Sequence, residues 1–328
     1  MSKTVAIIGA GQIGYAAAIA FRAEGWNVRV LARSKPEWLS GDVATFEHYV
    51  LGEHPTPTAD CVVDTIAYDE EDVARYDPDK VGRYIAISSA AVYRDYEGRS
   101  FDTAAITGFP DFDHPIAEDT PTIGAGPESY STKKIRMERK AHSLFGERSS
   151  VLRPCAIYGA WSRHAREWWF VKRIKDRRTI IPLAYEGKSV FHTTSARSIG
   201  RLSAFLANED CGGVFNIADD FAPDLKFMAE SIRDVFGKRI RFYLMEGPPQ
   251  GTVGRTPWSI PVTFELNCEK AFEAGFDGFD IYTHPDEAID WLRSIAMDEW
   301  RTVLPQLSAY PWDLFDYASE DRFLDKST

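Results

Sequence analysis

The sequence predicts an α/β fold built on a doubly wound parallel sheet, with a smaller region of mixed α/β structure toward the C-terminus. Short apolar runs alternate with helical segments along most of the chain. The first apolar run leads directly into a glycine pattern, GAGQIG, from Gly9 to Gly14. The 328 residues, with 44% hydrophobic and 27% charged residues, are enough for one large domain or two modest ones with a sizeable core.

The elements follow one another in order along the chain. A strand is expected at residues 4–8, a helix at 11–24 that ends at Gly25, and a strand at 27–32. Further strands are expected at 61–67, 83–89, 149–159, 213–218 and near 240–244, and further helices at 128–146, 196–207, 225–236 and 285–297. We therefore expect a nucleotide-binding domain from residues 1–155 and about 190–220. The substrate-binding region is expected to comprise about 156–189 and 221–328.

The glycine pattern lies between a strand and a helix, which is the context that a dinucleotide-binding loop requires. The first glycine allows the tight turn, the second lets the backbone approach a pyrophosphate, and the third lets the helix pack close to the strand. The N–H groups at the start of the helix face the phosphates. We therefore expect five residues to contact a cofactor here: Gly9, Gly11, Gln12, Ile13 and Gly14. Without that context, the pattern would equally fit an ordinary tight turn.

The end of the second expected strand distinguishes two cofactors. An acidic residue there binds the 2′-hydroxyl of NAD, whereas cations suit the 2′-phosphate of NADP. This chain has Arg33, Ser34 and Lys35 at that place and no acidic residue. The sequence therefore favours NADP, with Arg33 and Ser34 as contacts and NAD as the alternative. A solvated basic loop is the other interpretation, because Arg and Lys are mostly exposed in any protein.

The motif YSTKK places Tyr130 and Lys134 four residues apart, on one face of a helix. The pKa of a tyrosine is ordinarily near 10, and a neighbouring ammonium group favours the phenolate. Such a tyrosine can exchange a proton with a carbonyl or alcohol oxygen. Ser88 and Ser89 end an earlier strand, so their hydroxyls can reach the same edge of a parallel sheet.

Taken together, these motifs resemble the short-chain dehydrogenase/reductases, in particular the extended and atypical branch that includes nucleotide-sugar epimerases and dehydratases. The resemblance covers about residues 4–220 and rests on GAGQIG, SSAAVY, YSTKK, RPCAIYG and GGVFNIAD. It implies that Ser89 and Tyr130 form the catalytic pair. It also implies that Lys134 binds the nicotinamide ribose and tunes Tyr130.

The resemblance assigns further contacts to the cofactor. Asp42 and Val43 look like the pair at the adenine, and Ser88 lies at the strand end beside the cofactor. The remaining expected contacts border the cofactor and its nicotinamide: Ala67, Tyr68, Pro154 and Cys155.

The chain also departs from the family pattern. Ala156 stands where sugar-nucleotide members have Asn, and Ala90 and Ala91 stand where dehydratases have an acidic pair. An NADP-dependent oxidoreductase that interconverts a carbonyl and an alcohol is therefore the leading hypothesis. An epimerase with tightly held NAD(P) is the first alternative. The second is a non-catalytic member that senses NADP or associates with RNA.

Charge and composition bear on partners. The net charge of −11 argues against nucleic acid and anionic membranes, and we expect a cytoplasmic protein with a small-molecule substrate. One stretch, residues 162–178, carries seven Arg or Lys around two tryptophans. It could suit a nucleic acid, a phosphate-bearing substrate or a solvated helix face. The aromatic segment from Glu299 onward could pack on the substrate-binding region or form a homodimer.

No metal site is expected. The histidines His164, His192 and His284 stand apart, and the four cysteines show no metal-ligand spacing.

Overall fold

The computed structural model describes residues 2–283 and 285–327, which form two compact units. Unit 1 comprises the chain up to Ile157 together with Thr194–Asp219 and Leu266–Asp280. Unit 2 comprises Tyr158–Thr193, Asp220–Glu265 and the chain from Ile281 onward. Both units are assembled from separated stretches of sequence.

Unit 1 contains a seven-stranded sheet in which every neighbouring pair of strands is parallel. Its order is β11-β6-β5-β4-β1-β2-β3. The strands are β1 (Thr4–Ile8), β2 (Asn27–Ala32), β3 (Thr45–His48), β4 (Ala59–Asp64), β5 (Val81–Ile87), β6 (Ser149–Pro154) and β11 (Gly213–Ile217). The strand order reverses between β1 and β4, and ligands bind at such a switch point, outside the carboxyl ends of the strands.

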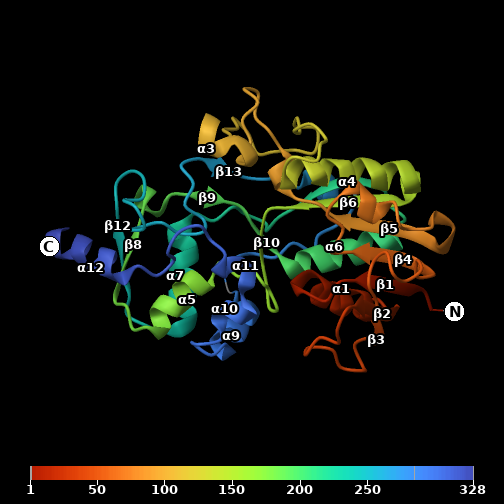
Figure 1. Cartoon of the computed structure of the whole chain (residues 1–328), viewed down its shortest axis with the longest axis horizontal. Helices are drawn as coiled ribbons and strands as arrows, with labels where there is room; N and C mark the ends of the chain where they lie inside the picture. The colour runs from red at the N-terminus through yellow and green to blue at the C-terminus, as the bar shows by residue number, and fades with distance from the viewer. Residues whose placement is uncertain (1, 284, 328) are drawn as a thin grey trace. The chain divides into compact units, whose positions relative to one another are not determined.

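Helices cover both faces of this sheet. Helices α1 (Gln12–Ala23) and α6 (Ala196–Asn208) lie on one face, and α4 (Tyr130–Phe145) lies on the other (Figure 1). Alternate residues of each strand serve the two faces: Ile7 packs with the α1 and α6 side, whereas Ile8 packs with the α4 side. The sheet is thus buried on both faces, as its continuous apolar strands require.

Shorter elements complete unit 1. They are α2 (Glu70–Val73), α3 (Ala104–Thr107), α8 (Glu269–Glu273) and the 3₁₀ turns η1 (Pro78–Lys80), η2 (Ala90–Val92), η3 (Phe101–Thr103) and η4 (Gly146–Arg148). The two-stranded pair β7 (Ala156–Tyr158) and β10 (Thr193–Ser195) lies where the chain passes between the units.

One segment differs from the sequence expectation. Residues 266–280, expected with the substrate-binding region, belong to unit 1. Leu266 bridges to Ile116, and Ala271 and Phe276 are buried in the core beside α6. Their apolar side chains thus complete the packing of the sheet rather than that of the other unit.

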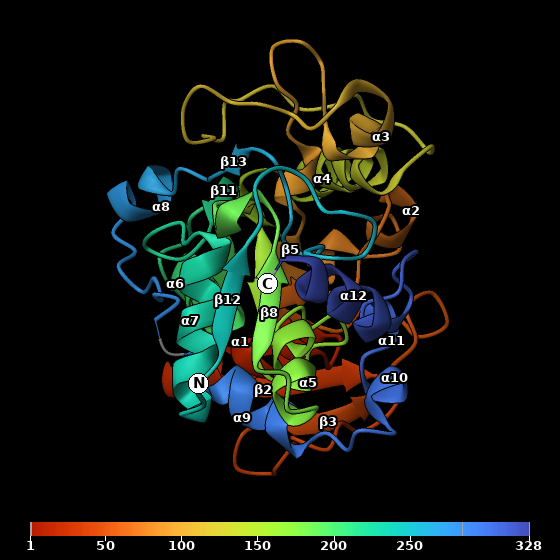
Figure 2. The same cartoon turned by 90° about the vertical axis from the view of Figure 1, so that its left-hand side faces the viewer.

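Unit 2 has two small parallel strand pairs and several helices. The strand β8 (Ile180–Leu183) pairs with β12 (Arg241–Leu244), as Figure 2 shows, and β9 (Val190–Phe191) pairs with β13 (Thr263–Phe264). The other elements are α5 (Trp168–Lys175), η5 (Tyr185–Gly187), α7 (Leu225–Phe236), α9 (Asp286–Ser294), α10 (Trp300–Val303), α11 (Pro305–Ser308) and α12 (Tyr317–Ser327). Its core is strongly aromatic, with Trp168, Trp169 and Trp258 fully buried.

Within the described ranges, no helix combines the length and apolar character needed to cross a membrane.

Candidate functional site

The glycine loop lies at the switch point of the sheet, between β1 and α1. Gly9 has a φ of +103°, and a Cβ there would lie 2.3 Å from Thr65 Oγ1, so only glycine fits. A Cβ on Gly14 would lie 2.2 Å from Gly9 O, so the helix can approach the loop only without a side chain. A Cβ on Gly11, by contrast, would meet nothing within 4 Å. The middle glycine thus borders open space.

The start of α1 also leaves polar groups available. Gly11 is the N-cap residue and supplies no side-chain hydrogen bond. Gln12 Oε1 is buried and has no hydrogen-bond partner in the described structure. A helix N-terminus with uncapped N–H groups favours an anion, and an unpaired buried oxygen is unfavourable until a donor reaches it.

Trp38 contacts the glycine loop from outside and was not predicted from the sequence. Its indole Nε1 donates a hydrogen bond of 3.0 Å to Ala10 O, and its ring packs edge-on against Tyr15 at 5.3 Å between centroids. Trp38 therefore fixes the backbone of the glycine loop from outside. In the sequence, Trp38 is only an isolated aromatic residue after a basic loop, and such a residue does not by itself indicate a contact with the glycine loop.

Arg33, Ser34 and Lys35 follow β2 and are exposed. Arg33 makes no ion pair with any residue that the structure describes, whereas its backbone O is 3.0 Å from His48 Nδ1. These side chains lie just beyond the carboxyl end of β2, on the same edge of the sheet as the glycine loop.

The structure does not bring Asp42 and Val43 to that edge. They lie in the turn before β3 and thus at its amino end, because β3 begins only at Thr45. Val43 packs against the core on the α1 side, and Ser40 holds the pKa of the exposed Asp42 carboxyl below its usual range by hydrogen bonding. This placement does not support the expected contact at the adenine; β3 was not predicted because its four residues, TFEH, are only partly buried and lack an apolar run.

Tyr130 is the first residue of α4. Ser129 caps the helix by accepting a hydrogen bond from Thr132 N, and Asp102 accepts hydrogen bonds from the hydroxyls of Ser129 and Ser131. Tyr130 is 43% exposed, and the centroid of its ring lies 5.7 Å from that of the Tyr68 ring. The capped first turn therefore holds a partly open phenol at the end of the helix that faces the carboxyl edge of the sheet.

Lys134 lies one turn further along α4 and is almost fully buried. Its Nζ donates hydrogen bonds of 2.7 Å to Ala67 O and 2.9 Å to Ile87 O, and it lies 5.8 Å from the centroid of the Tyr130 ring. Burial lowers the pKa of Lys134 to about 8, although the nearby carboxylates of Asp64 and Glu138 oppose this shift. A third Nζ proton remains beyond the two backbone carbonyls.

Asp64 ends β4 and was not predicted as a site residue. Its Oδ1 accepts hydrogen bonds from Ile66 N and Ala67 N, and its Oδ2 accepts them from the hydroxyls of Tyr76 and Tyr84. Burial raises the pKa of this carboxyl, against the effect of these hydrogen bonds. Asp64 therefore shapes the loop that presents Ala67 O to Lys134.

The two serines after β5 have different surroundings. Ser88 is buried, and its hydroxyl donates to Glu138 Oε1, so its side chain belongs to the framework beneath the site. Ser89 is half-buried, and its Oγ accepts a hydrogen bond of 3.1 Å from Ala91 N at the start of η2. Ser89 Oγ thus keeps its own proton to donate.

Pro154 and Cys155 lie at the carboxyl end of β6. Pro154 is buried, and Cys155 N donates a hydrogen bond of 3.0 Å to Thr194 Oγ1. The structure therefore places the predicted residues at or just after the carboxyl ends of β1, β2, β4, β5 and β6 and in the first turns of α4, with Asp42 and Val43 as the exceptions.

The basic stretch at residues 162–178 is occupied by contacts within unit 2. Arg173 is buried, with its guanidinium carbon 3.4 Å from the centroid of a Trp169 ring, and it pairs with Glu320 of α12. Arg178 pairs with Asp321. We call these four charged residues, Arg173, Arg178, Glu320 and Asp321, the C-terminal clamp. Of the seven cations, Lys172, Arg173 and Arg178 form ion pairs within unit 2, and both tryptophans are buried in its core.

The clamp also places the aromatic C-terminal segment, which packs on unit 2 itself.

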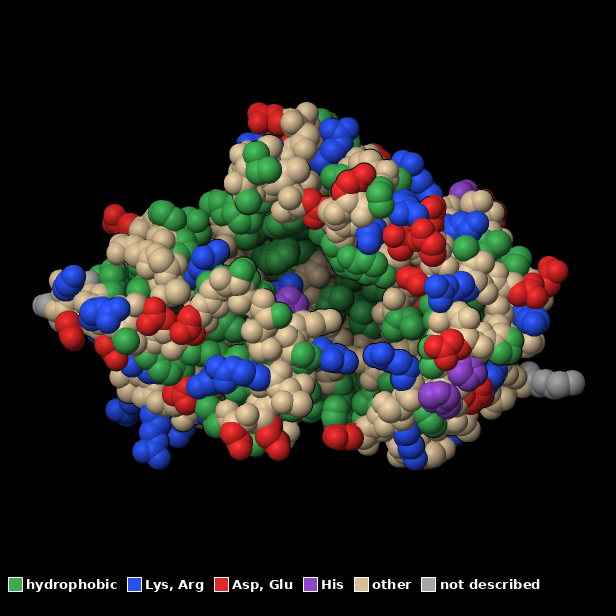
Figure 3. All heavy atoms as spheres, in the orientation of Figure 1, with side chains coloured by type: hydrophobic (Ala, Val, Ile, Leu, Met, Phe, Trp, Pro, Cys, Tyr) green, Lys and Arg blue, Asp and Glu red, His purple; other side chains and the backbone are tan. Residues whose placement is uncertain are grey.

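The face of the molecule in Figure 3 shows acidic and basic side chains interspersed. No group of three or more His, Cys, Asp or Glu side chains in the described part of the chain could hold a metal ion. His284 lies outside the described residues.

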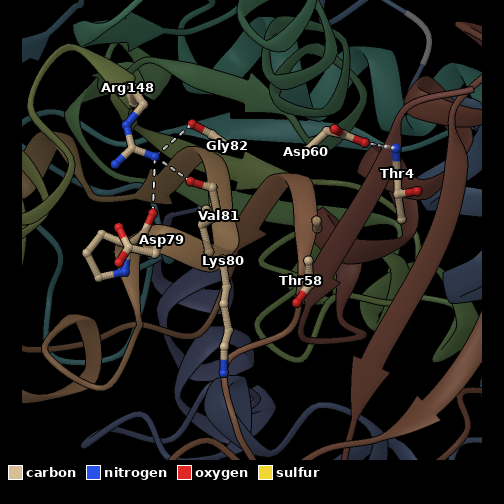
Figure 4. Close-up of a pocket in the computed structure, with 10 residues that line it drawn as sticks. Thr4, Thr58, Asp60, Asp79, Lys80, Val81, Gly82 and Arg148 are labelled. Atoms are coloured by element: carbon tan, nitrogen blue, oxygen red, sulfur yellow. Dashed lines mark hydrogen bonds between the residues drawn. The ribbon is translucent and has the colours of Figure 1, made fainter. Parts of the chain in front are cut away.

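A separate hollow of about 540 Å³ lies at the opposite, amino edge of the sheet. Arg148 reaches into it and donates hydrogen bonds to the backbone oxygens of Pro78, Val81 and Gly82 (Figure 4). Asp60 accepts a hydrogen bond of 2.7 Å from Thr4 N. Arg148 and Asp60 therefore hydrogen-bond to backbone groups at the strand ends. The predicted site residues lie at the other edge of the sheet.

No family model and no curated protein matches the chain, but solved structures do. UDP-N-acetylglucosamine 4-epimerase from Methanobrevibacter ruminantium M1, in complex with UDP-N-acetylmuramic acid, superposes with a TM-score of 0.65 at 17% identity, covering 89% of this chain and 99% of that one. The Bordetella bronchiseptica enzyme WbmH, in complex with NAD+, gives a TM-score of 0.64 at 15% identity, covering 90% and 99%.

A third solved structure extends the likeness. The dTDP-glucose 4,6-dehydratase from Bacillus anthracis, in complex with NAD, gives a TM-score of 0.62 at 16% identity, covering 92% of this chain and 100% of that one. The likeness spans both units and confirms the expected fold. The chain has the Rossmann-type, doubly wound architecture of these solved structures.

Proposed function

We propose that this protein is a nicotinamide-dinucleotide-dependent oxidoreductase that interconverts a carbonyl and an alcohol, with Tyr130 as the proton carrier. The observation that carries the proposal is the buried Lys134, held on Ala67 O and Ile87 O and lying 5.8 Å from the Tyr130 ring. Burying an ammonium group costs free energy unless nearby polar groups compensate for its lost hydration. Here it lies beside a phenol that can exchange a proton.

The residues present fit a dinucleotide. Gly11 borders open space at the start of α1, where a pyrophosphate would accept the N–H groups. The unpaired Gln12 Oε1 lies in the same loop and would accept a donor from the bound molecule. The remaining proton of Lys134 Nζ would bind a ribose hydroxyl. Gly11 and Gln12 follow β1, and Lys134 lies near the start of α4, on the edge of the sheet where such ligands bind.

In the proposed reaction, a nicotinamide bound here would supply or accept the hydride at the substrate carbon, and the side chains of the chain transfer the proton. In the direction of reduction, Tyr130 gives its hydroxyl proton to the carbonyl oxygen and becomes a phenolate. Lys134 stabilises that phenolate by its charge. Ser89 donates a hydrogen bond to the same oxygen and so stabilises the negative charge that develops there.

NADP rather than NAD is the proposed cofactor, because Arg33 and Lys35 are exposed beyond β2 and no acid lies among them. Calorimetry with NADP(H) and NAD(H) tests this. Arg33→Ala should weaken NADP(H) binding about tenfold or more, since hydrogen bonds to charged groups contribute roughly 1.5–3 kcal/mol, and it should leave NAD(H) binding unchanged. Arg22→Ala, an exposed arginine in the last turn of α1, is the control. Equal affinities of the wild-type protein for the two cofactors would contradict the preference.

An epimerase is the second candidate, because two of the solved structures of the same fold are nucleotide-sugar 4-epimerases from Methanobrevibacter ruminantium M1 and Bacillus cereus. An epimerase regenerates its cofactor, so the absorbance of NADPH stays constant during turnover. A reductase oxidises NADPH as it reduces a carbonyl substrate, so that absorbance falls. Dehydration is not proposed, because Ala90 and Ala91 offer no acid beside Ser89. Formation of a 4-keto-6-deoxy sugar from a nucleotide hexose would overturn that exclusion.

A further inference from the structure

A buried polar network lies beneath the proposed site and takes no part in the chemistry described above. Glu138, one turn beyond Lys134 on α4, is its centre. Glu138 Oε1 accepts hydrogen bonds from Ser88 Oγ and from Arg153 Nε, the latter at 3.0 Å. Glu138 Oε2 accepts a second one of 2.6 Å from Arg153 Nη2. Both side chains are only 7% exposed, so the pair is shielded from water.

The network continues beyond this ion pair. Arg153 Nη1 donates a hydrogen bond of 3.1 Å to the Tyr93 hydroxyl, which donates one of 2.7 Å to Asn216 Oδ1. The amide of Asn216 in turn donates to Ile116 O and Asn267 O. Six places in unit 1 are thereby joined through side chains: residues 88–93, Ile116, Glu138, Arg153, Asn216 and Asn267.

Each inner member of the network adjoins a residue of the proposed site. Ser88 precedes Ser89 and follows Ile87, whose O accepts a hydrogen bond from Lys134. Arg153 precedes Pro154, and Glu138 lies on the same face of α4 as Lys134. The ion pair therefore joins the carboxyl ends of β5 and β6 to the helix that carries Tyr130.

Stability alone is a poor explanation for such a pair. Desolvating two charges costs about as much as their attraction returns, and replacement of a buried pair by apolar residues is often neutral or stabilising. What apolar residues cannot supply is a fixed hydrogen-bonding geometry for the Ser88 hydroxyl and the strand ends. Catalytic groups lose efficiency when they move by even about 1 Å.

We propose that Glu138 and Arg153 are positioning residues that hold the turn carrying Ser89 and the end of β6 in a fixed arrangement against the Tyr130–Lys134 face of α4. This inference rests on the proposed function for its meaning, but the geometry that it concerns can be measured without a substrate. The carboxylates of Asp64 from β4, Asp72 from α2 and Glu138 from α4 all act on Lys134. A test must therefore separate geometry from charge.

The double variant Glu138→Leu/Arg153→Met keeps the net charge but removes one of the carboxylates that act on Lys134, whereas Ser88→Ala leaves all three in place, so the two variants together make that separation. We expect the thermal unfolding of the double variant to stay close to that of the wild-type protein. Amide hydrogen exchange at residues 87–92 should become at least about tenfold faster, and NADPH-dependent turnover should fall about ten- to a hundredfold with little change in KM.

The matched control is Arg83→Met/Asp210→Asn. Arg83 is a buried arginine at the other end of β5, where it pairs with Asp210 and donates to Cys211 O. This control should leave exchange at residues 87–92 and turnover unchanged. The milder variant Ser88→Ala, which removes only one hydroxyl, should change exchange and turnover in the same direction as the double variant but less.

Unchanged exchange at residues 87–92 in a folded double variant would overturn the proposal, as would unchanged exchange in Ser88→Ala if the double variant did not fold. Faster exchange together with wild-type turnover would also overturn it, since the pair would then be structural only. A wild-type protein that bound neither NADP(H) nor NAD(H) would instead refute the proposed function, and the exchange experiment would still decide the question of geometry.

Discussion

The two edges of the central sheet use their polar groups in opposite ways. At the amino edge, Arg148 donates to backbone oxygens around the start of β5, and Asp60 accepts from the first N–H of β1. At the carboxyl edge, the loop after β1 has an uncapped helix N-terminus and an unpaired Gln12 oxygen, and Lys134 brings a buried charge to the ends of β4 and β5.

The difference shows that a hollow in the surface is not by itself a ligand-binding site. The hollow at the amino edge is roomy, but its charged groups serve the strand ends that surround them. The carboxyl edge combines groups that are unfavourable without a ligand, which is the pattern expected where a ligand supplies the missing partner. The following experiments test whether function is confined to that edge.

The largest effect is expected for Tyr130→Phe. This variant keeps the ring, which packs against Tyr68, but deletes the proton. Turnover should fall by about 10²–10⁴, the usual contribution of general acid–base catalysis, whereas NADP(H) affinity should change little. Steady-state kinetics and calorimetry measure the two quantities. Near-normal turnover would mean that another group moves the proton, or that the site senses the cofactor without catalysis.

Lys134→Met should impair binding and turnover together, because one ammonium group would bind the ribose and stabilise the phenolate. We expect NADP(H) affinity to fall by roughly tenfold or more, as for the loss of a charge-assisted hydrogen bond. Lys140→Met, a half-buried lysine further along α4, is the control. An effect on turnover with unchanged affinity would separate the two roles and remove the ribose contact.

The pH dependence follows from the lowered pKa of Lys134, about 8 in the folded chain against an ordinary value of 10.5. As pH rises through 8, the folded protein loses this proton, so NADP(H) affinity should decline above that pH. Between pH 8 and 10.5 the unfolded chain binds more protons than the folded one, so this group makes the free energy of unfolding rise with pH. Calorimetry and denaturant titrations should show both trends in the wild-type protein, and neither should appear in Lys134→Met.

The smallest effect is expected at the amino edge. Arg148→Met removes hydrogen bonds to the backbone around β5, so the free energy of unfolding should fall by about 1 kcal/mol. Cofactor affinity and turnover should match those of the wild-type protein. A marked loss of cofactor affinity in a stably folded variant would show that the two edges are not separate in function.

Local patterns predicted the architecture well. The glycine spacing after a strand and the alternation of strands and helices both report short-range regularities, and the solved structures confirm the fold that they indicated. β3 was missed because TFEH is short and half-buried, and the misplacement of Asp42 followed from that. Unless β3 is recognised as a strand, the sequence cannot indicate whether Asp42 lies at its amino or its carboxyl end.

The polar framework was beyond prediction for a different reason. Asp64 and Arg153 stand inside or at the end of apolar runs, and their partners are distant in sequence. Glu138 looks like an ordinary surface residue of a charged helix, yet it is buried. The role of the basic stretch stayed open for the same reason, because Glu320, which pairs with Arg173, lies 147 residues further along the chain.

That last pairing has a consequence for how the chain is made. Synthesis proceeds from the N-terminus, and domains generally fold as they emerge. Here Arg173 of α5 has its carboxylate partner only once Glu320, 147 residues further along, has been added to the chain. The native packing of the guanidinium between Trp169 and Glu320 therefore requires α12 to be present, so α5 cannot complete this part of its core before α12 has been synthesised.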